Sequence, residues 1–384
     1  MFSKFMNVIL NLWILLLIFQ TGSVLYLNYN MYISSTFILM SLVIVIRKLK
    51  NLSFKLKELI YILFYFLLLL LSASVTYLET GFISNSLITH LLKMICIYLV
   101  LKIVGWNKFV DSFSEIILWL MSISFIMFVL VLIGAKLPLT YGVIGETPSY
   151  FYLLRTTGVD FNVGFNLIRN SGPFYEPGIY QVLLNFSLLY YYSIKRNNRV
   201  SFIILVVILS TLSPIGIAIS GIIVSSKYWN ILKNPKYFFY LLFIFFIILY
   251  FMVPFLINKM SSLSFELRIY DLKSGLSLFL KKPFFGYGFE NHNLHIIDSL
   301  ELFGISRKNS NGLINLILEN GIFYSTFYLF LLFKGFFKNT KHLVWFYVTI
   351  FQLIAQPIYL STVLIAFISF GIIDAKSDVY NKIR

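Results

Sequence analysis

The 384-residue chain is 59% hydrophobic and 12% charged, with a mean hydropathy of +0.86. Soluble domains are about half apolar and a quarter charged, and apolar runs of about 20 residues recur throughout this chain. The composition therefore excludes a soluble globular class and indicates a polytopic membrane protein. The single cysteine, Cys96, lies inside an apolar run, which excludes a disulfide framework and a cysteine-based metal site.

Membrane-spanning helices are expected, in chain order, at residues 5–27, 30–46, 59–78, 86–104, 116–135, 179–194, 237–257 and 312–333. The first segment resembles a signal peptide, but it lacks a small-residue cleavage site and is expected to remain as a helix. Two further apolar segments, 200–225 and 343–373, are interrupted by Pro214 and by Gln356-Pro357. Each is either one kinked helix or two short helices folded back on themselves.

The distribution of Lys and Arg favours the folded-back alternative. The basic connections then all lie on one face: RKLKNLSFKLK, KRNNR, KYWNILKNPK, KGFFKNTK and the C-terminal tail. The positive-inside rule places this face and both termini in the cytoplasm and accounts for most of the net charge of +16. Because the basic runs are short and scattered, they do not indicate a nucleic-acid partner. We expect an all-α polytopic membrane protein with about 12 transmembrane segments, including two short or broken pairs.

The predicted organisation has five parts. These are an N-terminal five-helix membrane part (1–135), a first large extracytoplasmic loop (136–178), central membrane helices (179–257), a second large extracytoplasmic loop (258–311), and C-terminal membrane helices with a cytoplasmic tail (312–384). Long loops in compact proteins are usually functional or disordered, and the Tyr, Phe, Leu and Ile in these loops argue against disorder. The alternative is a packing lid without chemistry.

The first loop ends in IRNSGPFYEPGIYQ, residues 168–181. Gly and Pro fix this backbone just before a helix that is expected to begin at about Ile179. Glu176 falls near the helix N-cap, where it acts either as a capping acid or in chemistry. Arg169 is close enough to share the same helix mouth, as a functional cation, an interfacial anchor or a partner of Glu176.

In the second loop, apolar residues recur at helical spacing from Phe265 to Leu280 and predict an amphipathic surface helix. Arg268, Asp271 and Lys273 are expected on or near its polar side. Arg307, near the end of the loop, has no motif around it and is expected to tolerate replacement by Lys.

A break follows this helix. Lys281 and Lys282 precede Pro283, and Gly286 and Gly288 predict a tight, backbone-exposed turn. The G-x-G pattern lacks the strand–turn–helix setting of a dinucleotide site.

His292 and His295 are candidates for a base or a hydrogen-bond donor, or are structural surface histidines. Without a third ligand at suitable spacing, they do not predict a metal site. Lys93 and Glu319 are charges within predicted spans. Glu319 is a functional candidate, whereas snorkelling accounts for Lys93.

Together these elements resemble the O-antigen and exopolysaccharide polymerase family (Wzy-type), relatives of the O-antigen ligases. The run R-N-S-G-P-F-Y-E-P-G at 169–178 is similar to the family's R-x-x-G-x-F-x-E-P-G element. Arg268 followed by K-K-P-F-F-G-Y-G at 281–288 is similar to its second-loop pattern, an arginine on a surface helix and then P-x-x-G-x-G. Ser310-Asn311 and G-I-F-Y at 321–324 resemble the ligase element H-[N/S/Q]-x9-G-x-x-[G/T/Y]. Because Ser310 replaces the ligase histidine, a polymerase is favoured over a ligase.

The resemblance implies a glycosyltransferase of the bacterial cytoplasmic membrane that joins undecaprenyl-pyrophosphate-linked oligosaccharide repeat units on the outer face. Its expected catalytic residues are Glu176, Arg268 and His292. Its expected substrate-binding residues are Arg169, Lys281, Lys282, Gly286, Gly288, His295, Ser310 and Asn311. The expected partners are the lipid-linked oligosaccharide, membrane lipid, a chain-length regulator and a flippase, with no nucleic acid, no cofactor and no metal ion.

Three alternatives stay open. The first is an O-antigen ligase, and the second is a non-enzymatic transporter or flippase for lipid-linked glycans. Transporters commonly show internal repeats and midplane charges, and this chain has no evident repeat. The third is a metal-dependent, polyprenyl-phosphate-using glycosyltransferase, which the absence of any D-x-D disfavours.

Overall fold

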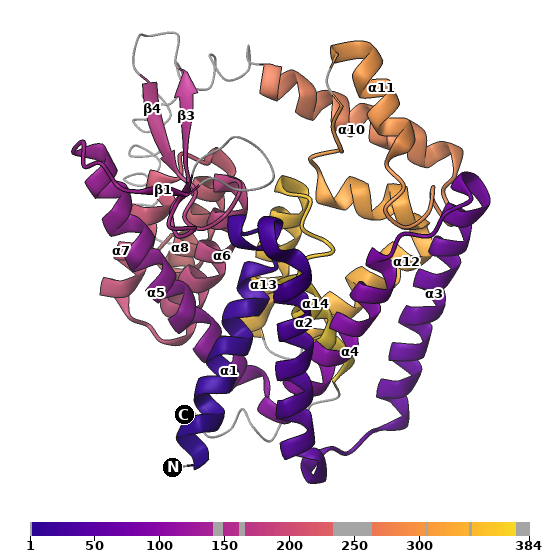
Figure 1. Cartoon of the computed structure of the whole chain (residues 1–384), viewed down its shortest axis with the longest axis horizontal. Coiled ribbons are helices and arrows are strands. Elements are labelled where there is room, and N and C mark those ends of the chain that lie inside the picture. The colour runs from indigo at the N-terminus through magenta and orange to yellow at the C-terminus, as the bar shows by residue number, and fades with distance from the viewer. Residues whose placement is uncertain are drawn as a thin grey trace.

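The computed structural model describes residues 2–140, 149–160, 166–232, 263–304, 306–337 and 340–373. Regular structure in these ranges is almost entirely helical (Figure 1). The helices are α1 (Phe2–Phe19), α2 (Val24–Arg47), α3 (Leu56–Thr80), α4 (Ser86–Val104), α5 (Trp106–Leu132), α6 (Pro177–Leu189), α7 (Asn198–Ser210), α8 (Pro214–Leu232), α10 (Leu263–Lys281), α11 (Asn293–Phe303), α12 (Gly312–Phe337), α13 (Thr340–Ala355) and α14 (Thr362–Ile372). A 3₁₀ turn, η1, covers Leu49–Asn51, and a π-helical turn, η2, covers Tyr190–Ile194.

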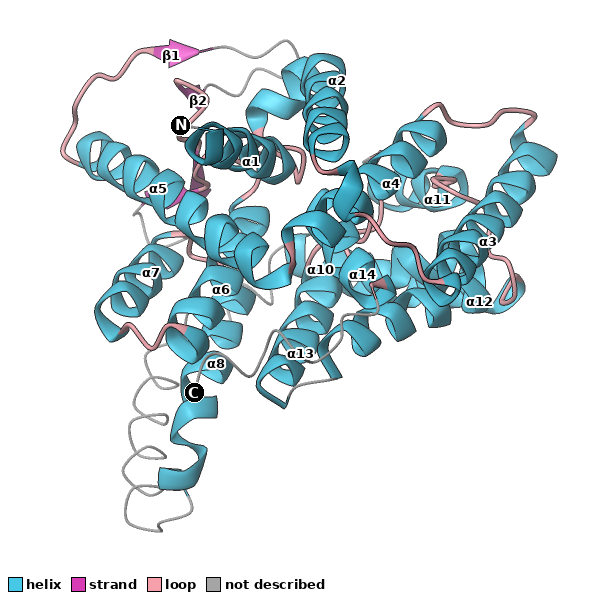
Figure 2. Cartoon of the chain, turned by 90° about the horizontal axis from the view of Figure 1, so that it is seen from below, coloured by secondary structure: helices cyan, strands magenta, loops and turns pink. Residues whose placement is uncertain are grey.

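Five of these helices, α2, α3, α4, α5 and α12, are long and apolar enough to cross a membrane. The prediction of an all-α chain with helices of spanning length is thus confirmed. The span expected at 237–257 and most of the C-terminal tail lie outside the described residues. Seen from below, α4 and α14 lie in the middle of the bundle, with α3 and α12 on one side and α6, α7 and α8 on the other (Figure 2).

The first helix boundary differs from the prediction, which placed the break at residues 28–29. Instead, α1 ends at Phe19, and Gly22 turns the chain with a φ of +122°. Ser23 then caps α2, because its Oγ accepts the backbone N–H of Tyr26 (3.0 Å). A kink remains at Tyr29, whose backbone angles are not helical. The sequence shows little sign of this turn, because only the four small or polar residues at 20–23 interrupt the apolar run.

Both interrupted apolar segments fold as pairs of short helices, as the charge distribution favoured. Pro214 begins α8, where its ring suits the first helical turn, and α7 and α8 pack against each other. Helix α14 begins after Ser361, whose Oγ accepts the N–H of Leu364 (3.4 Å). Helices α13 and α14 both pack along α12. The turns of both pairs lie at the same end of the bundle as the two large loops.

The two large loops contain regular structure at one end of the bundle, opposite the end where α1 begins (Figure 1). In the first loop, four strands form two antiparallel hairpins that the sequence did not predict. These strands are β1 (Leu139–Thr140), β2 (Ser149–Tyr150), β3 (Thr156–Asp160) and β4 (Asn166–Asn170). In the second loop, α10 confirms the amphipathic helix expected from Phe265 to Leu280, and α11 follows it.

The glycine turn of the second loop is built into a break in α12. Gly321 interrupts that helix with a φ of +69°. Two carbonyl groups next to the break accept backbone N–H groups of the turn. The N–H of Tyr287 donates to the carbonyl of Leu318 (2.9 Å), and the N–H of Gly288 donates to the carbonyl of Glu319 (2.7 Å). The predicted tight turn is confirmed, but its expected exposure is wrong: residues 286–288 are buried, and the glycines permit this close approach of two backbones.

We predict that Gly286→Ala destabilises the protein much more than Gly304→Ala. Both glycines have a left-handed backbone, with φ of +68° and +66°, so each alanine costs about 1–2 kcal/mol in strain. A Cβ at Gly286 would also lie 2.5 Å from the Leu318 carbonyl oxygen, whereas nothing lies within 4 Å at Gly304. The expected total at Gly286 is about 3 kcal/mol or more. The measurement is the unfolding temperature in detergent, and equal losses at both positions would contradict the described contact.

Candidate functional site

The segment 169–178 is held by the turn between α1 and α2. The backbone N–H of Val24 donates to the carbonyl of Pro173 (3.0 Å), and the N–H of Tyr175 donates to the carbonyl of Gly22 (3.1 Å). The segment therefore leads into α6 with a fixed backbone.

Arg155, a residue that sequence reasoning missed, supports this segment from the other side. Its side chain is buried and lies over the Tyr175 ring, 4.1 Å from the centroid, and it donates to the Tyr175 carbonyl. Its backbone N–H donates to the Gly172 carbonyl (2.7 Å), and its carbonyl accepts the N–H of Ser171 (2.9 Å). No sequence motif surrounds Arg155, so its role was visible only in the folded loop.

Arg169, on β4, is half-buried and reaches the turn between α7 and α8. Its Nε donates to the carbonyl of Thr211 (3.0 Å). This is its one hydrogen bond within the described part of the chain, so its Nη1–Nη2 edge has no partner there. Burial lowers the pKa of Arg169, the charge of Glu176 raises it, and the charge of Arg268 lowers it.

Arg268, on α10, reaches the end of α13 in the same way. Its Nη1 donates to the carbonyl of Ala355 (3.4 Å). Burial lowers the pKa of Arg268, while the charges of Glu176 and Asp271 raise it and that of Arg307 lowers it. The two arginines, from separate loops, thus share the influence of one carboxylate.

That carboxylate, Glu176, is exposed at the N-cap position of α6. Its side chain makes no capping hydrogen bond, so the capping interaction suggested by the sequence is not formed. It acts electrostatically on both Arg169 and Arg268. One carboxylate thus acts on two guanidinium groups, and the three residues together carry a formal charge of +1. We call them the Arg–Glu–Arg group.

Glu176 also lines a cavity of about 710 Å³ at this end of the bundle. The walls come from the α1–α2 turn, the first half of α2, the start of α4 and the turn after α13. Much of the lining is polar or aromatic, including Gln20, Tyr26, Asn30, Ser34, Asn85, Ser86, Thr89, His90, Tyr175, Phe289, Glu290 and Gln356. The cavity therefore presents amides, hydroxyls and rings beside the Arg–Glu–Arg group.

Lys93 lies in the wall of this cavity and is only 8% exposed. Its Nζ donates to the Tyr26 hydroxyl (3.0 Å) and lies 5.1 Å from the centroid of that ring. No carboxylate in the described ranges forms an ion pair with it. A buried ammonium group beside a cavity differs from the snorkelling side chain that the sequence suggested.

His292 is buried beside Glu319 and is not a surface histidine. Its Nδ1 lies 3.3 Å from Oε1 of Glu319, and the other carboxyl oxygen accepts from Tyr359 and from the N–H of Glu290 (3.0 Å). Burial, aided by the charge of Lys308, lowers the pKa of His292 to about 3. The imidazole is therefore neutral at pH 7 and can serve as a hydrogen-bond partner of this carboxyl group.

Asp271 was expected near the polar side of α10, and this expectation was wrong: the residue is fully buried. Its carboxylate accepts from His295 Nε2 (3.1 Å), Arg307 Nη2 (2.6 Å), and both Oγ (2.6 Å) and N–H (2.9 Å) of Ser310. Burial raises the pKa of Asp271, but the bonds from His295 and Ser310 and the Arg307 charge outweigh it, so the pKa is lowered. Arg307, which was expected to tolerate replacement by Lys, is therefore part of a buried ion pair.

The other predicted site residues have their hydrogen-bond partners outside the Arg–Glu–Arg group. His295 and Ser310 are engaged by Asp271, and Gly286 and Gly288 lie in the turn against α12. Their proposed contact with substrate stays a prediction.

Three more predicted residues lie at the ends of helices in or next to the second loop. Asn311 caps α12, because its Oδ1 accepts the N–H of Ile314 (3.1 Å). Lys282 forms an ion pair with Glu79, and Lys281 is exposed.

The fold and the site define an all-α protein with five helices able to cross a membrane and, at one end, a cavity that Glu176 lines together with polar, aromatic and apolar residues. No protein-family model, curated protein or solved structure matches the chain. Across the described ranges, no three His, Cys, Asp or Glu side chains converge as a metal site.

We predict that Asp271→Asn destabilises the protein by about 3–5 kcal/mol, because it breaks a buried ion pair and turns one acceptor into a donor. Glu301→Gln, an exposed acid on α11, is the matched control and should change stability by less than about 0.5 kcal/mol. The measurement is the unfolding midpoint of each variant in the same detergent. Similar midpoints for both variants would show that Asp271 does not hold the loop together.

Proposed function

We propose that this protein is an oligosaccharide polymerase. It transfers a glycan from one undecaprenyl-pyrophosphate carrier to a repeat unit on another, on the outer face of the bacterial cytoplasmic membrane. The observation that carries this proposal is the Arg–Glu–Arg group, in which the charge of Glu176, a residue that lines the cavity, acts on Arg169 and Arg268 from two separate loops. The sequence resemblance to Wzy-type polymerases supports the same activity.

The two arginines suit a pyrophosphate leaving group. A guanidinium keeps its charge and can grip phosphate oxygens with two parallel hydrogen bonds. The Nη1–Nη2 edge of Arg169 has no partner among the described residues. Arg268 donates one long hydrogen bond, from Nη1 to the carbonyl of Ala355. Because both are half-buried, their charge acts more strongly than it would in water. Stabilising the departing pyrophosphate is where such cations contribute most to the rate.

The reaction assigns each group one task. A hydroxyl of the acceptor sugar attacks the anomeric carbon of the donor glycan, and a new C–O bond forms. The bond from that carbon to the pyrophosphate oxygen breaks, and the pyrophosphate leaves with the electron pair. The hydroxyl proton passes to the carboxylate of Glu176, which is exposed and makes no capping bond.

The cavity suits the acceptor glycan. Its amides and hydroxyls match sugar hydroxyl groups, and its rings, such as Tyr26 and Tyr175, can pack against sugar faces. Its volume of about 710 Å³ lies within the usual range for small-molecule sites.

The membrane arrangement follows from the same proposal. The loops with the Arg–Glu–Arg group face outward, and about 12 spans with both termini in the cytoplasm place the basic connections inside.

We predict that Arg169→Lys and Arg268→Lys each reduce polymerisation by about 100- to 1,000-fold, because lysine keeps the charge but loses the planar fork. Arg199→Lys, an exposed arginine at the opposite end of the bundle, should have no effect. The measurement is polymer length on a gel from a deletion strain that expresses each variant at matched membrane abundance. Normal polymer from both site variants would show that these two arginines do not bind the leaving group.

The variant Glu176→Gln should distinguish a catalytic role of Glu176 from a structural one. Because the side chain makes no capping bond, the loss in stability should stay below about 1 kcal/mol, the size of a helix-dipole interaction. Polymerisation should fall by about 100- to 10,000-fold, since glutamine cannot accept a proton. Polymer assays and unfolding temperatures are measured on the same membranes. Full activity of the variant would remove Glu176 as the base.

A further inference from the structure

One side of α4 presents a row of polar residues to the cavity that Glu176 lines. Ser86, Thr89, His90 and Lys93 are all part of the cavity wall. Because they follow one another at i, i+3, i+4 and i+7, they lie on one side of the helix, and the residues between them are apolar. At 1.5 Å per residue, Lys93 lies about 10 Å along the helix from Ser86. The cavity therefore extends about two turns along α4, to a buried ammonium group.

Gln20, in the turn directly after α1, contributes a second buried polar group to the cavity wall. It is only 6% exposed, and neither its Nε2 nor its Oε1 has a hydrogen-bond partner among the described residues. A buried amide without partners is rare in folded proteins, because it loses its hydrogen bonds with water and gains none. The amide is therefore available to a polar ligand in the cavity.

The ammonium group of Lys93 is only partly satisfied. Its Nζ donates to the Tyr26 hydroxyl (3.0 Å), which leaves two of its three N–H groups without a hydrogen bond to a described residue. The Tyr26 hydroxyl accepts this bond and can donate its own proton, and Tyr26 is part of the cavity wall. Lys93 and Tyr26 together thus offer three donors to a ligand.

Two acids, Glu176 and Glu290, line the same cavity, but neither forms an ion pair with Lys93. Glu176 acts on the two arginines of the Arg–Glu–Arg group, and Oε2 of Glu290 accepts from the hydroxyls of Ser84 (3.2 Å) and Ser86. The charge of Lys93 consequently has no carboxylate partner among the described residues. Charges buried in this way within a membrane span are usually functional.

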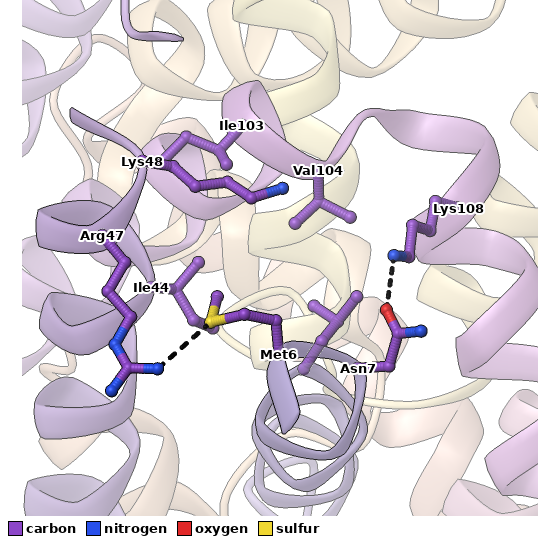
Figure 3. A pocket seen from close by; sticks show the side chains of 9 residues that line it. Met6, Asn7, Ile44, Arg47, Lys48, Ile103, Val104 and Lys108 are labelled. Atoms are coloured by element: carbon purple, nitrogen blue, oxygen red, sulfur yellow. Dashed lines mark hydrogen bonds between the residues drawn. The ribbon is translucent and has the colours of Figure 1, made fainter. Parts of the chain in front are cut away.

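A second cavity, of about 450 Å³, lies at the opposite end of the bundle and provides a comparison (Figure 3). There the Nζ of Lys108 donates to Oδ1 of Asn7 (2.7 Å), and Nη1 of Arg47 donates to Sδ of Met6 (3.8 Å). Among the described residues that line this second cavity, none has a buried polar side-chain atom without a partner. The unpaired amide of Gln20 is therefore a feature of the cavity that Glu176 lines.

We propose that Gln20, Tyr26 and Lys93 form a subsite for the carboxylate of an acidic sugar in the acceptor glycan. This inference rests on the proposed function, because that function makes the cavity a glycan site. A carboxylate has two acceptor oxygens and no donor, which suits the three donors of Lys93 and Tyr26 and the Nε2 of Gln20. Its charge also compensates the buried ammonium group, which a neutral sugar cannot do. The Oε1 of Gln20 then accepts from a neighbouring sugar hydroxyl.

The test measures binding separately from catalysis. The purified full chain, in phosphatidylcholine nanodiscs without sugar detergent, is titrated with methyl β-D-glucuronide and with methyl β-D-glucoside, which has a hydroxymethyl group in place of the carboxylate. Saturation-transfer NMR gives each dissociation constant. Wild type should bind the glucuronide about tenfold more tightly, because its carboxylate forms charge-assisted hydrogen bonds. Lys93→Met should lose this preference, whereas the same replacement of Lys273, an exposed lysine on α10, should keep it.

A second variant, Gln20→Leu, removes the two unpaired amide atoms. It should weaken the binding of both sugars about fivefold and keep the preference for the glucuronide, because Lys93 remains. Neither Gln20→Leu nor Lys93→Met should lower the unfolding temperature of the ligand-free protein, since neither breaks an ion pair or leaves a described partner buried and charged. Lower unfolding temperatures for both variants, with sugar binding unchanged, would assign these residues a structural role and overturn the proposal.

The comparison of the two sugars on wild type needs no variant and is decisive on its own. Equal binding of glucuronide and glucoside, or no binding of either, would overturn the subsite. If the same protein still polymerises repeat units, only the subsite fails. A preference for the glucuronide in a protein that makes no polymer would support the subsite and reject the polymerase.

Discussion

A buried row of amide side chains joins α6 to both broken helix pairs. Gln181 Nε2 donates to Gln352 Oε1 on α13 (2.9 Å), and Asn185 Nδ2 donates to Gln181 Oε1 (2.9 Å) and to the Gly216 carbonyl on α8 (3.2 Å). All three amide side chains are fully buried. In a membrane interior no water is present to bond such groups, so they must form hydrogen bonds with other groups of the protein. Each bond contributes only about 1 kcal/mol, but together they fix how α8 and α13 meet α6.

The position of the Arg–Glu–Arg group depends on how α8 and α13 pack against α6. Helix α6 begins directly after Glu176, and the broken pairs turn next to Thr211 and Ala355, whose carbonyls accept from Arg169 and Arg268. Each of two loops that are far apart in the sequence is thereby attached to the end of a short helix. Preorganised cations of this kind cost little reorganisation when charge develops on a leaving group. The pairing of short, broken helices is thus part of the site and not a defect of the bundle.

The sequence was informative where a feature is local. Hydropathy and periodicity identified the long helices, the break at Pro214, the surface helix α10 and the glycine turn. It failed where a partner is distant. Asp271 reads as a polar-face residue by periodicity, but its partners Arg307 and Ser310 come from the far end of the loop and bury it. Arg155 carries no motif, and only the folded loop shows that it supports the segment before α6.

The most direct measurement is the reaction itself. The purified protein, reconstituted in bilayer nanodiscs, is mixed with a synthetic undecaprenyl-pyrophosphate-linked repeat unit matched to its host, and products are followed by mass spectrometry. We expect a lipid-linked dimer and longer oligomers, with one undecaprenyl pyrophosphate released for each glycosidic bond formed. A folded protein that leaves the lipid-linked repeat unit unchanged under these conditions, or that moves it across the bilayer without joining units, would contradict the proposed polymerase activity.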